Sequence, residues 1–132
     1  MNNSMLYVLM SLKNAALAKK SFVKLNIDRK NIPLIKLLYN KGLIQSVQIL
    51  NSEKKYVDNT FVVLYIRYYY NNSLLEKLKI VSSPTKKKII QLKDVARLSE
   101  SNNILFFSTS LGLKTLLECK KDKTGGVVLF TC

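Results

Sequence analysis

The first half of the chain switches repeatedly between the two periodicities that distinguish helices from strands. Apolar side chains recur at helical spacing over residues 4–20 and 31–41, which is typical of amphipathic helices. Residues 21–27 and 43–50 alternate apolar with polar side chains, and residues 60–70 form a β-branched and aromatic run, both typical of strands. This order predicts an α-β-α-β-β unit, because each amphipathic face must be buried against another element.

The second half carries shorter segments that are richer in strand signals. The polar residues Asn71–Ser73 separate it from the first half, and we expect the lobe boundary there. Strands are predicted over residues 74–81, 86–90, 104–110 and 127–132, and a short helix over about residues 114–121. We therefore expect an α+β fold of two lobes: an N-terminal α/β lobe over residues 1–71 and a mostly β C-terminal lobe over residues 72–132.

Histidine is absent from the 132 residues, and its absence excludes several kinds of active site. A Ser-His-Asp triad, a Cys-His dyad and a zinc deaminase centre each need a histidine. The two cysteines, Cys119 and Cys132, form no CxxC pair, so we expect reduced thiols rather than a disulfide framework. The chain is expected not to be an enzyme and to need no metal or other cofactor.

The charge balance indicates the class of partner. The chain has 22 Lys and Arg against 8 Asp and Glu, a net charge of +14, and the basic residues are spread over both halves. A folded chain with this much dispersed positive charge is typical of proteins that bind a polyanion, most often nucleic acid. The alternative is a charged surface that serves solubility alone. No apolar run approaches the roughly 18 residues of a membrane span, so no membrane partner is expected.

Three consecutive hydroxyl residues, Ser108, Thr109 and Ser110, end an apolar predicted strand and are followed by Leu111 and Gly112. Each hydroxyl can donate and accept hydrogen bonds, so the segment can meet base edges, ribose hydroxyls and phosphates. Gly112 permits close backbone approach or a positive φ. The alternative is a polar turn that caps the helix predicted to begin near residue 114.

Four landmarks occur in a characteristic order along the chain. The Ser-Thr-Ser-x-Gly segment is followed by a short helix and by Gly-Gly before the last strand. The other three lie upstream: Val81-Ser82-Ser83-Pro84, Leu12-Lys13-Asn14-Ala15, and Leu38 to Ile44 with Gly42 before an aliphatic pair. In order and spacing these landmarks resemble the universal small-subunit ribosomal protein eight family, over about residues 4–132.

The resemblance implies two lobes and a structural role without chemistry. It implies that the chain binds the central domain of small-subunit rRNA, supports its assembly and contacts neighbouring small-subunit proteins, with no small-molecule substrate. The residues then expected to bind rRNA are Ser108, Thr109, Ser110, Gly112, Lys13, Asn14, Ser82, Lys86, Lys87, Lys88 and Glu118. For Glu118 the alternative is a solvated helix position, and for the three lysines it is a solvated edge strand protected by charge.

The chain departs from the family pattern at several basic and aromatic positions. Leu111 replaces a common Lys, and Ser83 replaces an Arg. Thr85 and Ile89 stand where the family has Gly and Tyr. The run 86–88 offers phosphate partners that compensate, although Lys acts as a point charge without the fork geometry of Arg.

The run Tyr68-Tyr69-Tyr70 is a further place where bases could stack. Alternation along the predicted strand puts Tyr68 and Tyr70 on the core face. Tyr69 shares the opposite face with Arg67 and is the stacking candidate of the run.

Composition also bears on origin and on the alternatives. Lys, Asn, Ile, Tyr and Phe are abundant while Arg and Gly are scarce, as in proteins encoded by AT-rich organellar genomes. We expect an organelle-encoded protein of the mitochondrial ribosome, with the bacterial cytoplasm or a plastid as alternatives. A free-standing RNA-binding regulator of the same fold is the alternative function. An enzyme would need two carboxylates that converge in one cleft with shifted pKa values.

Overall fold

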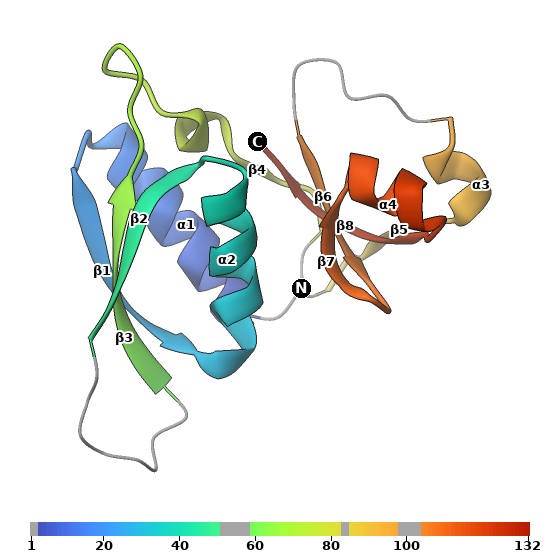
Figure 1. Ribbon diagram of the computed structural model, residues 1–132, viewed down its shortest axis with the longest axis horizontal. Coiled ribbons are helices and arrows are strands. Elements are labelled where there is room, and N and C mark those ends of the chain that lie inside the picture. The colour runs from blue at the N-terminus through green and yellow to red at the C-terminus, as the bar shows by residue number, and fades with distance from the viewer. Residues whose placement is uncertain (1–2, 51–58, 83–84, 98–103) are drawn as a thin grey trace. The chain divides into compact units, whose positions relative to one another are not determined.

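The computed structural model describes residues 3–50, 59–82, 85–97 and 104–132 (Figure 1). The chain divides into two compact units, residues 3–77 and residues 78–132. Helices and antiparallel sheets occur together, which confirms the expected α+β class. Within the described ranges, no helix is both long enough and apolar enough to cross a bilayer.

The N-terminal unit has the α-β-α-β-β order that the alternating periodicities predicted. Its elements are α1 (Asn3–Leu17), β1 (Phe22–Asp28), the 3-10 turn η1 (Arg29–Asn31), α2 (Ile32–Asn40), β2 (Ile44–Leu50), β3 (Asn59–Ile66) and the 3-10 turn η2 (Leu74–Lys77). The strands form an antiparallel sheet in the order β1-β3-β2. Figure 1 shows α1 and α2 on the same side of this sheet.

The side of the sheet that faces the helices is the core of the N-terminal unit. On β3, Val62, Leu64 and Ile66 are buried on this side; on the other side Phe61 and Tyr65 keep exposed surface, although Val63 between them is buried. The alternation follows from the period of two along a strand, which turns successive side chains to opposite faces. The helices complete the core with fully buried leucines, among them Leu9, Leu12, Leu34 and Leu38.

The C-terminal unit is a second antiparallel sheet with two short helices. Its elements are β4 (Lys79–Ile80), β5 (Lys88–Ile90), α3 (Leu92–Val95), β6 (Leu105–Thr109), β7 (Gly112–Thr115), α4 (Leu116–Asp122) and β8 (Gly126–Thr131). The strand order is β4-β8-β6-β7, and β5 also pairs with β8. The core on one side of this sheet consists of Val95, Phe107, Leu116, Cys119 and Val128.

One local expectation for secondary structure was wrong, and one predicted helix is present but starts two residues later than expected. The strand predicted over residues 74–81 is the 3-10 turn η2 followed by the two-residue strand β4. The helix predicted from about residue 114 begins at Leu116, because residues 112–115 pair with β6 as a strand. In both places a short segment suits either element, and its pairing partners decide which one forms.

The tyrosine run also differs from expectation. Strand β3 ends at Ile66, and the chain then turns through Tyr70 and Asn71, which have φ values of 50° and 63°. Tyr70 is therefore 83% exposed instead of closing the core, because the period of two does not continue into the turn. Tyr68 is half-buried and its hydroxyl donates a hydrogen bond to the carbonyl oxygen of Lys20. Tyr69 is exposed beside Tyr70.

Candidate nucleic-acid interface

The hydroxyl segment forms the tip of a β-hairpin. Thr109 at the end of β6 pairs with Gly112 at the start of β7, so Ser110 and Leu111 form a two-residue turn. Gly112 has a φ of 114°, a conformation that favours glycine. The alternative of a turn that caps the next helix is wrong, because the N-cap of α4 is Thr115.

The Thr109 hydroxyl shapes this turn from within. Its Oγ1 donates a hydrogen bond to the carbonyl oxygen of Gly112 at 2.8 Å and accepts one from the amide of Leu111 at 3.2 Å. Ser110 is exposed and Ser108 is half-buried, so these are the two hydroxyls that the tip can offer to a ligand. The three hydroxyls of the segment therefore have different tasks, although the sequence made them look equivalent.

Strand β8 approaches this hairpin closely at its glycine pair. A Cβ on Gly126 would collide with the carbonyl oxygen of Ser108, and a Cβ on Gly125 would lie 2.7 Å from the carbonyl oxygen of Ile90. The two glycines therefore let β8 run between β5 and β6 without steric conflict. This packing fixes the position of Ser108 in the sheet.

Ser82 lies inside the protein rather than on its surface. Its side chain is completely buried, and its Oγ donates a hydrogen bond to the carbonyl oxygen of Val128. The same Oγ accepts a hydrogen bond from the amide of Lys88 at 2.9 Å. Ser82 thus ties β8 to the first residue of β5. Its neighbour Ser83, where the family pattern has Arg, lies outside the described residues.

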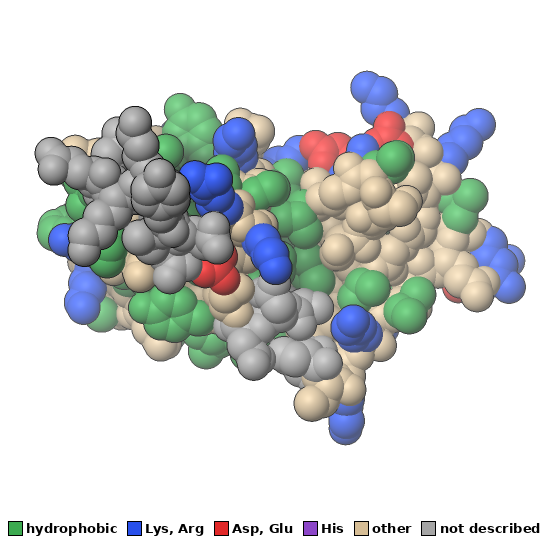
Figure 2. All heavy atoms as spheres, turned by 90° about the horizontal axis from the view of Figure 1, so that it is seen from below, with side chains coloured by type: hydrophobic (Ala, Val, Ile, Leu, Met, Phe, Trp, Pro, Cys, Tyr) green, Lys and Arg blue, Asp and Glu red, His purple; other side chains and the backbone are tan. Residues whose placement is uncertain are grey.

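The lysines of the run 86–88 are all exposed. Lys88 opens β5 and pairs with Val128, whereas Ile89 pairs with Val127, which in turn pairs with Ser108. Because direct cross-strand partners share a face, Ile89 and Ser108 lie on one face of the sheet and Lys88 on the other. On the face of the molecule that Figure 2 shows, basic side chains lie at separate places rather than in one block.

Glu118 stabilises the start of α4. Its carboxylate accepts a hydrogen bond from the amide of Thr115 at 3.1 Å, the arrangement of a capping box. On the same unit, Lys114 of β7 pairs with Asp122 of α4, and this hydrogen bond raises the pKa of the Lys114 ammonium. Glu118 is therefore not simply a solvated helix residue, because its carboxylate binds the backbone amide of Thr115. The same contact means that RNA would not be the only partner of this carboxylate.

Lys13 and Asn14 belong to α1 and so to the N-terminal unit. Asn14 is exposed and Lys13 is half-buried. The remaining expected residues belong to the C-terminal unit, where the sheet brings the hydroxyl hairpin and β5 to either side of β8.

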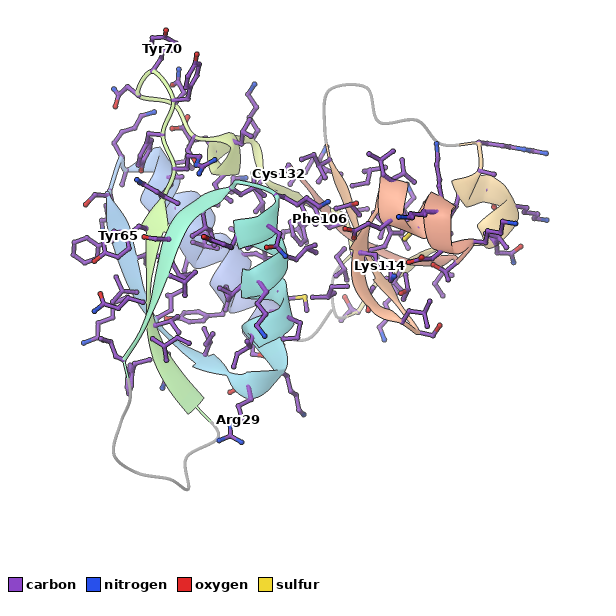
Figure 3. All side chains as sticks on the ribbon, viewed as in Figure 1. Arg29, Tyr65, Tyr70, Phe106, Lys114 and Cys132 are labelled. Carbon is purple, nitrogen blue, oxygen red and sulfur yellow. The ribbon has the colours of Figure 1, made fainter. Side chains whose placement is uncertain are left out.

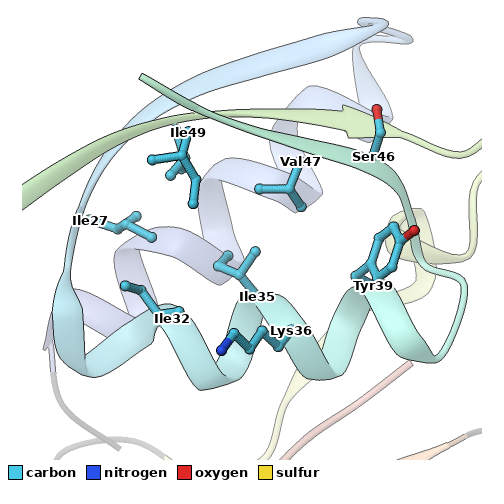
Figure 4. Close-up of a pocket in the computed structure, with 9 residues that line it drawn as sticks. Ile27, Ile32, Ile35, Lys36, Tyr39, Ser46, Val47 and Ile49 are labelled. Atoms are coloured by element: carbon cyan, nitrogen blue, oxygen red, sulfur yellow. The ribbon is translucent and has the colours of Figure 1, made fainter. Parts of the chain in front are cut away.

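The N-terminal unit has an apolar groove between α2 and β2, with a volume of about 370 Å³ (Figure 4). Its lining is mainly aliphatic, with Ile27, Ile35, Val47 and Ile49. Lys36 and Tyr39 lie along its helical side. Ser46 adds a hydroxyl at the strand side, and the rest of the lining is aliphatic.

The described carboxylates offer little for acid–base chemistry. Glu76 forms an exposed ion pair with Lys19, and the hydrogen bond from Lys19 lowers the pKa of the Glu76 carboxyl. The described residues also contain no group of three or more His, Cys, Asp and Glu side chains placed to hold a metal ion.

Comparison with known proteins agrees with the resemblance of the four landmarks. The family model described as ribosomal protein S8 matches residues 4–132. The small ribosomal subunit protein uS8c of Phaseolus angularis is 29% identical over 122 residues, which cover 89% of this chain and 88% of that protein. The small ribosomal subunit protein uS8 of Borreliella afzelii is 28% identical over 123 residues, covering 92% and 90%. The chain therefore belongs to the ribosomal protein S8 family.

Proposed function

We propose that this chain binds the central domain of small-subunit rRNA and that the β6–β7 hairpin tip makes the discriminating contacts. Membership of the family gives the chain a structural, non-enzymatic role in the small ribosomal subunit. The observation that carries the proposal is the tip itself: Ser108 and Ser110 offer hydroxyls on a turn shaped by the hydrogen bonds of Thr109 and the positive φ of Gly112.

Binding has two layers in this account. The lysines neutralise phosphates and supply affinity that falls with salt, without selecting a sequence. The hydroxyls and the backbone amides of the turn then recognise one irregular RNA shape, since specific RNA recognition favours loops and bulges. Ser82 acts indirectly, because its hydrogen bond to the Lys88 amide holds the start of β5 in place. Glu118 likewise orders α4 beside the hairpin.

The test compares variants that keep the turn intact. The protein is titrated with a central-domain rRNA fragment, as wild type and as Ser108→Ala with Ser110→Ala. Loss of two hydrogen bonds is expected to weaken binding by about tenfold or more. Ser11→Ala, a half-buried hydroxyl of α1, is the matched control and should bind like wild type. Equal affinity of the double variant and the wild type would remove the site assignment.

The lysine run is tested by the salt dependence of the same binding reaction. Replacing residues 86–88 with Gln is expected to lower the slope of log affinity against log salt by up to about 3, if all three contact phosphate. If the variant has the same slope as the wild type, these lysines do not contact phosphates and face solvent instead. The hydroxyl variants should keep the wild-type slope, because they remove no charge.

Fractionation of a cell extract tests both the compartment of the protein and the alternative function as a free-standing regulator. We propose a mitochondrial ribosome on the basis of the composition, while relatives named uS8c and uS8 come from plants and bacteria. Sedimentation of the chain with small subunits of one compartment identifies that compartment. A free-standing regulator of the same fold would instead sediment with messenger RNA outside ribosomes.

A further inference from the structure

Aromatic rings are exposed on the face of the N-terminal sheet that points away from α1 and α2. Phe22 of β1 is 51% exposed and Phe61 of β3 is 43% exposed. Tyr65 is half-buried next to Phe22, and Figure 3 shows it beside the sheet on the side away from the helices. The exposure of single apolar side chains is ordinary, but several aromatic rings on one sheet face form a patch that calls for a partner.

The register of the strands defines this surface, which we call the open face. Direct cross-strand partners share a face, and they form three rows about 7 Å apart along the strands. The rows are Phe22, Tyr65 and Ser46; Lys24, Val63 and Gln48; and Asn26, Phe61 and Leu50. An aromatic ring thus lies in each outer row. Asn26 accompanies Phe61, whereas Ser46, at the register shift of β2, also lines the groove beside α2.

The open face combines stacking surfaces with a cation. The rings of Phe22 and Tyr65 have centroids 6.0 Å apart and are tilted by 48°. Lys24 lies between the two outer rows, and its Nζ is 5.9 Å from the ring centroid of Phe61. Rings interleaved with basic side chains are the arrangement by which sheet surfaces bind unpaired bases and their phosphates.

Charge favours RNA over a protein partner. Lys24 occupies the middle row of the open face, whereas the centres of protein–protein interfaces are depleted of Lys. Asp28, the acidic residue of the three strands as described, lies on the same face one pair beyond Asn26 and Phe61, at the end of β1. Amide side chains of Asn26 and Gln48 flank the rings and can hydrogen-bond base edges.

We propose that the open face binds a single-stranded RNA segment. One base stacks at Phe22 and Tyr65 and another at Phe61, while Lys24 binds the phosphate between them. This surface belongs to the N-terminal unit and needs none of the hydroxyls of the β6–β7 hairpin, so it is a second RNA contact beyond the function proposed above.

The test uses the full-length protein and fluorescein-labelled decauridine, an RNA without secondary structure. A variant with Phe22→Leu, Phe61→Leu and Tyr65→Leu keeps apolar side chains and removes the aromatic faces. Its affinity for decauridine is expected to fall by at least about tenfold. The variant Tyr7→Leu, which removes an exposed aromatic ring of α1 outside both proposed RNA sites, is the matched control and should keep wild-type affinity. Circular dichroism checks that both variants fold.

A second measurement needs no variant. Ultraviolet crosslinking of decauridine to the wild-type protein, mapped by mass spectrometry, is expected to label β1 and β3 at Phe22, Phe61 or Tyr65. Labelling confined to other segments would overturn the proposal, as would equal decauridine affinities of the leucine variant and the wild type. If the leucine variant binds decauridine normally but fails to join the small subunit, the open face binds a protein and the proposal is wrong.

Discussion

Replacing Ser82 with Ala should destabilise the C-terminal unit. The Ser82 side chain is fully buried, and its Oγ both donates to the Val128 carbonyl oxygen and accepts from the Lys88 amide at 2.9 Å. Ser82→Ala leaves these two backbone groups without that partner. A buried polar group left unsatisfied costs about 1–3 kcal/mol, so we expect a loss of about 2 kcal/mol in the free energy of unfolding.

Urea denaturation followed by circular dichroism measures this loss. With a slope of about 2 kcal/mol per M urea, a change of about 2 kcal/mol lowers the unfolding midpoint by about 1 M. Ser110→Ala is the matched control, because this serine is exposed at the hairpin tip. Its free energy of unfolding should stay within about 0.5 kcal/mol of the wild type.

The same two variants behave oppositely if the RNA affinity is measured. Ser110→Ala should weaken binding of the central-domain fragment, whereas Ser82→Ala, which acts only through the position of β5, should weaken it less under conditions where it is fully folded. An unchanged urea midpoint for Ser82→Ala, together with a large loss of RNA affinity, would refute the reasoning. It would mean that Ser82 meets RNA directly and that the buried hydrogen bonds contribute little.

Three further predictions concern stability and reactivity. Glu118→Ala should lower the free energy of unfolding by about 1 kcal/mol in urea denaturation, because the Thr115 amide loses its acceptor, and Glu118→Gln should restore part of it. The hydrogen bond from Lys19 lowers the pKa of the Glu76 carboxyl below its usual 4.5. The ion pair therefore stabilises the fold above pH 4.5, and this stabilisation is lost as the pH falls through the lowered pKa. The thermal unfolding temperatures of wild type and Glu76→Gln should differ at neutral pH and converge in acid. Burial raises the pKa of Cys132 to about 11, so at pH 8 the native protein should react slowly with a thiol reagent and the urea-unfolded protein rapidly, and equal rates would contradict this.

The fold of the N-terminal unit was predictable because the apolar periodicity of a long amphipathic segment indicates both its secondary structure and its buried face. Residues 4–20 carry enough helical turns for the apolar stripe to be unambiguous, and α1 forms there. The four residues of β7 carry no such signal. They become a strand because Thr109 and Gly112 close a two-residue turn and place residues 112–115 against β6. That pairing is a property of the assembled hairpin.

The sequence predicted which residue types belong to the candidate site, but it did not predict the different structural role of each residue. Thr109, Ser82 and Ser110 carry the same functional group in the sequence, yet they respectively shape a turn, join two strands and face solvent. These roles depend on burial and on partners far along the chain. For the same reason the open face was missed: Phe61 and Tyr65 read as part of a strand, and only the position of the helices shows which of its sides is exposed.

The most direct test places a cleavage probe on the hairpin tip inside small subunits. Both native cysteines are buried, so the single substitution Ser110→Cys provides an exposed thiol for a hydroxyl-radical probe. The account predicts strand cleavage of the small-subunit rRNA that clusters within its central domain and is absent with unprobed protein. Cleavage confined to other domains, or none at all in subunits that contain the labelled protein, would contradict it.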